Sequence, residues 1–160
     1  MQTDVTSENS FTLPTYYGIG WSLRLNDKLL VTSDYKQSKW SKSKPLETNI
    51  KFVNSKSYIV GAEYIPSNSF RDQGWKRIHY RVGGYINDSY MLIGGQQIQD
   101  KGLTFGIGLP ILKSKMFINI AYQIGQKGAG SNQNIITENY QNLNINITLF
   151  DFWFAKPKFD

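Results

Sequence analysis

The sequence of 160 residues contains no cysteine, a single histidine, no long apolar run and little charge. The absence of cysteine excludes disulfides, thiol catalysis and cysteine-ligated zinc. The lone histidine, His79, gives no basis for a histidine-based metal site or a catalytic triad. No apolar run approaches the roughly 18 residues that a membrane-spanning helix requires. We therefore expect no enzyme activity, no catalytic residue, no metal and no cofactor.

The opening segment, Met1 to Asn9, is polar and acidic. It has neither the basic region nor the apolar region of an export signal. For an exported protein, this predicts that the chain begins after its signal or is a fragment of a longer one.

The net charge of +6 suits either nucleic acid or an anionic lipid surface. The basic residues are scattered, apart from a modest cluster at Lys36, Lys39, Lys42 and Lys44, which we interpret as a solvated strand end and loop. Nucleic-acid binding needs a basic stripe with stacking aromatics. Most aromatics here share a strand face with Ile and Leu instead, so we expect no nucleic-acid partner.

Apolar and polar residues alternate with a period of two along most of the chain, which predicts strands rather than helices. The alternation is cleanest in residues 102–110, 116–125 and 142–150, where Ile and Leu face away from Gly, Asn and Thr. The expected strands cover residues 14–26, 28–41, 55–66, 75–87, 101–110, 114–126 and 138–152.

Several of these expected strands have about nine to thirteen residues, compared with about five or six in soluble proteins. A tilted strand that crosses a bilayer needs about nine to eleven. The predicted fold is therefore all-β, an antiparallel up-and-down transmembrane β-barrel with about seven strands present. We expect a loop or disordered segment at 1–12, barrel strands over 13–154 and a periplasmic tail at 155–160.

The two faces of the predicted strands differ sharply. The apolar faces carry no charge, as expected for side chains that meet lipid, where a charge near the midplane costs about 2–4 kcal/mol. The opposite faces are rich in Gly, Asn and Thr, which suits a crowded, wet lumen. The candidate lumen-facing charges are Arg24, Asp34, Glu63, His79 and Arg81.

Among these charges, Glu63 and Arg81 lie on consecutive predicted strands and are expected to pair. Glu63 is a candidate gating or selectivity charge, since ionisable residues in membrane segments are often functional. The alternative is that an ion pair with Arg81 or Arg24 braces the wall. His79 is interpreted as a wall residue rather than a base.

Connections of alternating length also favour an outer-membrane barrel, which has short turns on one side and long loops on the other. The connections near Asn26 and Pro110 are short, whereas those at about 42–54, 87–100 and 126–138 are long. The aromatics agree in part with girdles at the two ends of the strands. Tyr35, Tyr58 and Tyr122 are expected at the long-loop end; Tyr64, Trp75, Tyr80, Phe152, Trp153 and Phe154 are expected at the short-turn end, and Trp21 fits neither.

The segment YRVGGYINDSYMLIGGQQIQDKGLTFGIGLPI, Tyr80 to Ile111, resembles the C-terminal half of FadL-like (long-chain fatty acid transporter-like) outer-membrane proteins. In that family an arginine-containing strand leads into a long outer loop with a small charged motif, here Asp100-Lys101, followed by a glycine-rich strand. The opening LPTYYGIGWSLRLNDKLLVTSDYKQSKWS is similar to the family as well. The resemblance runs from about Leu13 to the end.

This resemblance implies a closed barrel of about fourteen strands with an N-terminal plug. The chain supplies about seven strands, an odd number, and no plug-like segment. We therefore expect half of a larger barrel, whose missing N-terminal half is a candidate partner. No ligand-binding residue of the family can be transferred to this chain.

The function that the resemblance implies is passive transport of hydrophobic small molecules, such as fatty acids, across the bacterial outer membrane. The expected partners are outer-membrane lipid, lipopolysaccharide and the transported molecule. One alternative is a structural or docking barrel of a secretion or adhesion complex, suggested by the long Asn-, Gly- and Ser-rich loops. Another is a soluble lipid-binding barrel that closes around an apolar interior.

Overall fold

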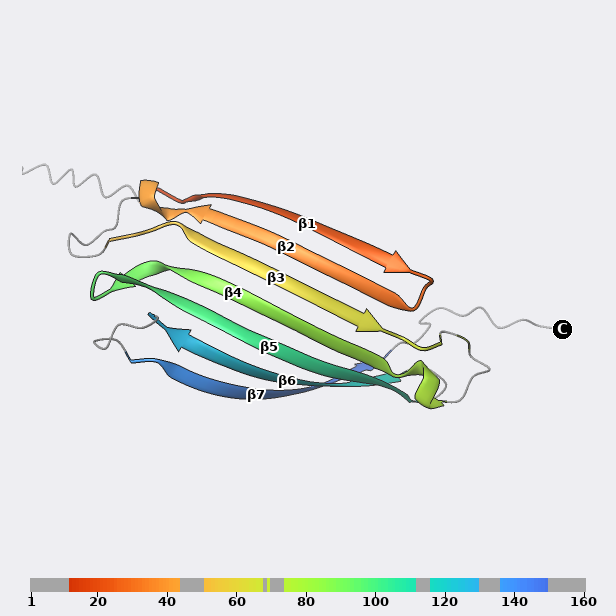
Figure 1. The fold of residues 1–160 in the computed structure, drawn as a ribbon. Coiled ribbons are helices and arrows are strands. Elements are labelled where there is room, and N and C mark those ends of the chain that lie inside the picture. Colours follow the sequence, from red (N-terminus) through yellow and green to blue (C-terminus); the bar gives the residue numbers. More distant parts are fainter. Residues whose placement is uncertain are drawn as a thin grey trace, which may run out of the picture.

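In a computed structural model the chain forms one open antiparallel sheet of seven strands, in the order β1-β2-β3-β4-β5-β6-β7 (Figure 1). The structure describes residues 12–43, 51–67, 69, 74–111, 116–129 and 136–149. The strands are β1 (Thr15–Leu25), β2 (Leu29–Lys39), β3 (Ser55–Tyr64), β4 (His79–Ile93), β5 (Gln96–Ile111), β6 (Met116–Gly128) and β7 (Glu138–Leu149). Two short 3₁₀ helices, η1 (Trp40–Lys42) and η2 (Gly74–Arg77), flank β2 and β4.

The all-β, up-and-down architecture predicted from the alternation is confirmed, and each strand pairs with its neighbours in the chain. The strands have 10 to 16 residues, longer than is usual in soluble proteins. In the described residues the sheet does not close, because β1 and β7 form its two edges. The closed transmembrane barrel therefore remains a prediction.

The connection between β4 and β5 is a tight hairpin, so the long loop expected at 87–100 is wrong. Gly94 and Gly95 have φ of 59° and 79° and join strands that continue past the rest of the sheet. Positive φ at both central residues matches the right-handed twist of a hairpin. Asp100 and Lys101 consequently lie within β5 and not in an outer loop. A register shift between Asp88 and Leu92 interrupts the pairing of β4 with β5, which resumes at Leu92 and Ile93.

The predicted alternation of short and long connections is also wrong. The tight turn after β1 is as expected, with φ of 48° at Asn26 and 52° at Asp27. The connection on the same side between β3 and β4, however, runs from 65 to 78 and includes η2, because residues 75–77 are not part of a strand. On the opposite side, the β4–β5 turn has only two residues. Connection length therefore no longer indicates which end of the sheet faces outward.

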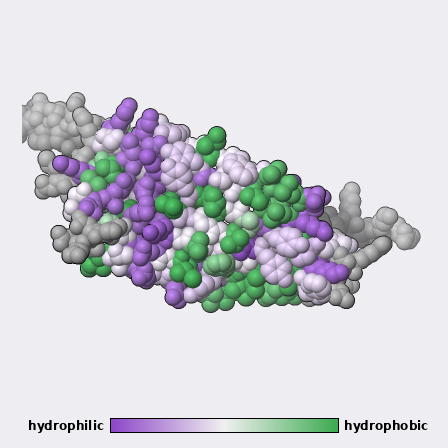
Figure 2. Space-filling view, viewed as in Figure 1, coloured by the Kyte–Doolittle hydropathy of each residue, from purple (hydrophilic) through white to green (hydrophobic). Residues whose placement is uncertain are grey.

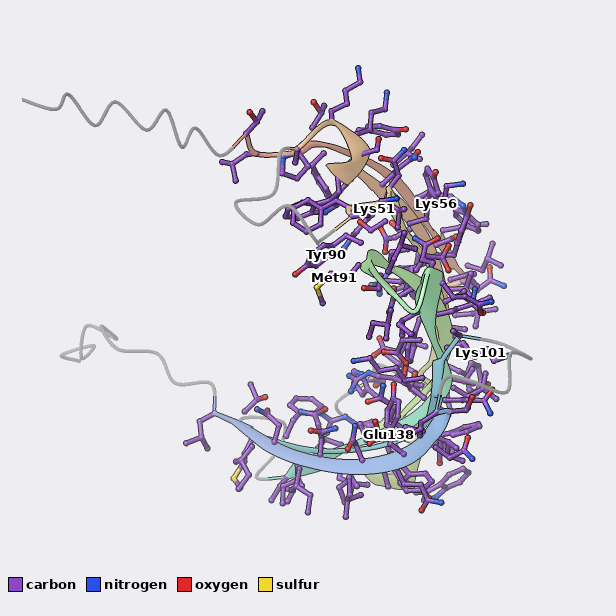
Figure 3. The ribbon with its side chains drawn as sticks, turned by 90° about the vertical axis from the view of Figure 1, so that its left-hand side faces the viewer. Lys51, Lys56, Tyr90, Met91, Lys101 and Glu138 are labelled. Atoms are coloured by element: carbon purple, nitrogen blue, oxygen red, sulfur yellow. The ribbon has the colours of Figure 1, made fainter. Side chains whose placement is uncertain are left out.

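The sheet is strongly curved and has a C-shaped cross-section when viewed along the strands (Figure 3). Side chains alternate between the two faces, so each face is defined by the strand register. The concave face carries Glu138 and many of the polar side chains, whereas Lys56 and Lys101 lie on the convex side. The convex face carries the apolar side chains and is the one seen in Figures 1 and 2.

The described residues contain almost no hydrophobic core. Only Ile65, Ile98 and Ala129 are buried apolar residues. A single sheet without a second layer leaves both of its faces open, whereas soluble domains bury one face against another element. The expected N-terminal segment 1–12, apart from residue 12, and the expected tail 155–160 lie outside the described residues, as do Phe152, Trp153 and Phe154.

Candidate functional site

The convex face is an apolar band that crosses all seven strands. The registers align its side chains in transverse rows, one of which consists of Leu23, Val31, Ala62, Val82, Phe105, Tyr122 and Leu143. Its side chains are well exposed, with Trp21 at 57% and Ile145 at 65%. Contiguous apolar surface of this kind marks a site of protein or membrane contact. In Figure 2 the band is the green and pale region that covers the centre and right of the molecule.

A hydrophilic belt bounds this apolar band on the side of the β4–β5 hairpin. It appears as the purple stripe at the left of Figure 2. We define the polar belt by the residues Gln37, Lys56, Asp88, Gln99, Lys101 and Gln126.

Tyrosines line both borders of the apolar band. The rings of Tyr35 and Tyr58 lie 4.9 Å apart next to the polar belt, and the Tyr35 hydroxyl donates to Gln37 Oε1 at 3.0 Å. Tyr64 and Tyr80 face each other across β3 and β4 at the other border. Tyr122 lies in the middle row rather than at the long-loop end, so its predicted place is wrong. Amphipathic rings at the two edges of an apolar band are typical of membrane strands.

The concave face carries all five charged or titratable residues predicted to face a lumen: Arg24, Asp34, Glu63, His79 and Arg81. The structure brings three of them together. Whether this face encloses a lumen remains a prediction. Arg24 and Asp34 make no hydrogen bond or ion pair with any other described residue.

Glu63 and Arg81 form the ion pair expected from their positions. They face each other in the register of β3 and β4, and Arg81 Nε donates to Glu63 Oε2 at 2.6 Å. His79 Nδ1 lies 3.3 Å from the same oxygen. The Glu63 side chain is 21% exposed and that of Arg81 is 41% exposed. Glu63 thus accepts a hydrogen bond from Arg81 and lies within reach of His79 on the same face.

Arg81 also reaches across β5 to β6. Its Nη1 donates to Asn119 Oδ1 at 2.9 Å, over a stretch of β5 that carries Gly106 and Gly108 on this face. A Cβ added at Gly108 would lie 2.9 Å from Asn119 Oδ1 and 3.1 Å from His79 Cβ. The absence of a side chain at Gly108 therefore leaves the space in which Arg81, His79 and Asn119 come together.

A second bridge on the concave face spans still more of the sheet. The hydroxyl groups of Tyr85 on β4 and Tyr140 on β7 are hydrogen-bonded across the two intervening strands. Tyr140 donates to Asp100 Oδ1 at 2.7 Å, and Gln123 Nε2 donates to the Tyr85 oxygen at 2.6 Å. An added Cβ at Gly125 would collide with the Tyr140 ring. We did not predict this cluster, although the alternating glycines of β5 and β6 mark where long side chains can cross.

An aromatic cluster lies at the end of the sheet that carries the β4–β5 hairpin. Trp40 stacks on Tyr90 with ring centroids 4.5 Å apart, and Phe52 packs edge-on against both rings. Phe52 also forms a β-bridge with Met91. Tyr90 and Met91 lie on the concave side of the sheet in Figure 3. The cluster therefore ties the end of β2 to the extended part of β4.

The two edge strands are open in the described part of the chain. Every residue of β1 is exposed, and most of β7 is exposed as well. Because all neighbouring strands are antiparallel, β1 and β7 run in the same direction. They cannot pair with each other in the antiparallel manner of the other strands. An open edge presents unpaired backbone groups that accept another strand.

The described residues were also compared with the requirements of a metal site and of a membrane-spanning helix. No group of three or more His, Cys, Asp or Glu residues there is arranged to hold a metal ion. No helix of the described chain is long and apolar enough to cross a membrane.

In a comparison with known protein families, the family model BamG matches the chain over residues 1–160. No curated protein and no solved structure matches the chain. The family match shows that the FadL-like resemblance is wrong, and with it the expected transport of fatty acids or other hydrophobic small molecules. The glycine and aromatic pattern behind the resemblance is shared by amphipathic strands in general. The chain belongs to the BamG family, a family of Bam-complex components associated with the bacterial outer membrane.

Proposed function

We propose that this chain is a structural and docking component of the Bam complex, held in the outer membrane by the apolar convex face of its sheet. The family match across residues 1–160 is the observation that carries the proposal. The docking alternative from the sequence analysis is retained here, with the Bam complex in place of a secretion or adhesion complex.

The convex face supports contact with lipid. Its strands present an uncharged apolar band with tyrosines at both borders. The charges of the convex face, Lys56, Asp88 and Lys101, lie outside this band in the polar belt. From Ile19 to Leu25 the band extends about 20 Å along the strand, at about 3.4 Å per residue. That length is comparable to the apolar band of about 25 Å in outer-membrane barrels.

The direction of curvature argues against the soluble lipid-binding barrel. Such a barrel closes around an apolar interior, so its apolar side chains would lie on the concave face. Here the concave face holds Glu63, Arg81 and the tyrosine hydroxyls instead. This geometry favours lipid on the outside and a polar interior.

The open edges support docking. In a bilayer each unpaired backbone group costs several kcal/mol, so a sheet edge there must be paired. β1 and β7 therefore need strands from elsewhere, either from further parts of a longer chain or from another Bam-complex component. This requirement makes the two edges the expected contact sites.

Two experiments test the proposal in the bacterium that makes this protein. In the first, outer membranes are washed with alkaline carbonate and with urea. The tagged chain should stay with the membrane, and release by either wash would contradict lipid contact.

In the second experiment, a photo-cross-linker is placed at Tyr16 on β1 or, as a control, at Ala62 in the middle of the sheet.

We expect the Tyr16 probe to cross-link the chain to a Bam-complex protein or to another part of the same chain. The Ala62 probe should cross-link only to lipid. Equal protein cross-linking from both positions would contradict edge docking.

A further inference from the structure

An open groove of about 930 Å³ crosses the convex face over β3 to β7. It lies where the apolar band meets the polar belt. Its apolar lining comes from Tyr58, Val60, Ile86, Leu103 and Ile124. The belt side is lined by Lys101, Gln126, Asn139 and Gln141. Volumes of this order are typical of sites for small molecules.

Gly84 forms the floor of this groove. It occupies a position in the apolar band that carries a large side chain in most other strands, between Val60 on β3 and Leu103 on β5. A Cβ added there would lie 3.4 Å from Leu103 Cδ2 and 4.0 Å from Val60 Cγ2. The missing side chain at Gly84 therefore deepens the groove between Val60 and Leu103.

Lys101 supplies a positive charge at the rim. In the register it lies between Ile86 on β4 and Gln126 on β6. Among the described residues, the ion pairs are those of Glu63 with His79 and Arg81, on the opposite face. Lys101 thus lacks an acidic partner in the described chain. In the next row of the belt, Lys56 lies opposite Asp88, so these two charges offset each other and Lys101 is the cation at the rim of the groove.

We propose that this groove binds a membrane lipid that carries a phosphate, with one acyl chain over Gly84 and the phosphate against the Lys101 ammonium group. An apolar slot beside a cation matches the two parts of such a lipid, and a basic side chain near a membrane surface contributes about 1 kcal/mol of attraction to anionic lipid. The inference rests on the proposed function, which places the convex face in the bilayer.

Native mass spectrometry of the full chain in detergent micelles tests the site. Phosphatidylglycerol, lipid A, uncharged diacylglycerol and inorganic phosphate are added in separate arms. We expect phosphatidylglycerol or lipid A to be retained about fivefold or more above diacylglycerol, corresponding to one charge contact. Inorganic phosphate alone should not be retained. A preference for phosphatidylglycerol or for lipid A would show which of these two phosphate-bearing lipids the groove accepts.

The variants separate a site from general adhesion. Gly84→Val fills the floor, and Lys101→Gln removes the charge; each should reduce retention about fivefold. Ala62→Val makes a comparable change in the next row of the same face, and Lys127→Gln removes a lysine from the opposite face. Both controls should bind lipid as the unmodified chain does. Circular dichroism verifies that all four variants keep their β-structure.

Equal retention of diacylglycerol and phosphatidylglycerol would overturn the role of Lys101. Retention unaffected by Gly84→Val would overturn the groove, as would binding of inorganic phosphate alone at the same level. The two proposals fail separately. A chain that is washed off membranes yet shows the variant-sensitive lipid binding contradicts the membrane placement and leaves the groove intact.

Discussion

The Arg81 guanidinium joins three strands, because it donates to Glu63 on β3 at 2.6 Å and to Asn119 on β6 at 2.9 Å. Both side chains of the Glu63–Arg81 pair are partly exposed, so water screens the attraction. Exposed pairs typically contribute about 0.2–1 kcal/mol. In a double-mutant cycle of Glu63→Gln and Arg81→Gln, we expect a coupling free energy of about 0.5–1 kcal/mol.

The measurement is urea unfolding of the chain refolded into detergent micelles. Arg24→Gln is the matched control, since Arg24 lies on the same face without a described partner. Its coupling to Glu63→Gln should be close to zero. If the two cycles gave equal coupling free energies for Arg24 and Arg81, Glu63 would respond to the overall positive charge of the concave face and not to a specific ion pair with Arg81.

The close approach at Gly108 predicts a destabilising effect of Gly108→Ala. The new Cβ would meet Asn119 Oδ1 at 2.9 Å and His79 Cβ at 3.1 Å, so at least one bridging side chain must move. Overpacking of this kind costs about 1–3 kcal/mol. Gly74→Ala is the control, because an added Cβ there meets nothing within 4 Å. Unfolding in urea should separate the two variants, and equal stability would contradict the packing seen around Gly108.

The Tyr85–Tyr140 bridge predicts that two hydroxyl groups help to set the curvature of the sheet. Removing both, with Tyr85→Phe and Tyr140→Phe, leaves the rings but breaks the connection from β4 to β7. We expect a longer and broader distance between spin labels at Ser22 and Asn142, which lie near opposite edges of the concave face. The distance is measured by pulsed electron paramagnetic resonance.

Tyr122→Phe provides the control for this experiment. Its hydroxyl donates to Gln141 at 2.8 Å on the convex face, and its loss should leave the label distance unchanged. An unchanged distance in the Tyr85/Tyr140 double variant would mean that backbone pairing alone determines the curvature.

Parts of this fold could be predicted from the sequence because they depend on alternation alone. The strand faces, the pairing of Glu63 with Arg81 and the tight turn at Asn26 all follow from a period of two and local turn chemistry. The extension of β4 through Asp88 could not be predicted in this way. Its polar residues and the Gly94-Gly95 pair resemble a loop, although β4 pairs with β5 on both sides of the register shift.

The contacts that skip strands could not be predicted either. Tyr85 and Tyr140 meet because the sheet is curved, and curvature is a property of the whole sheet rather than of any one strand pair.

The function of the protein was predicted less well than its fold. The alternating pattern of 116–125 suits many amphipathic sheets, so it carries no information on whether the protein transports a molecule or belongs to a complex.

The last prediction compares the two faces of one strand. Leu103 and Thr104 are neighbours on β5, and Leu103, which is 56% exposed, lies on the convex face. If that face meets lipid, Leu103→Arg places a charge in the apolar band and should cost about 2–4 kcal/mol. Thr104→Arg places the same charge on the polar face, where water can reach it, and should cost less than 1 kcal/mol. Unfolding of both variants in phospholipid vesicles gives the difference between them, and equal costs in vesicles would contradict contact between the convex face and the membrane.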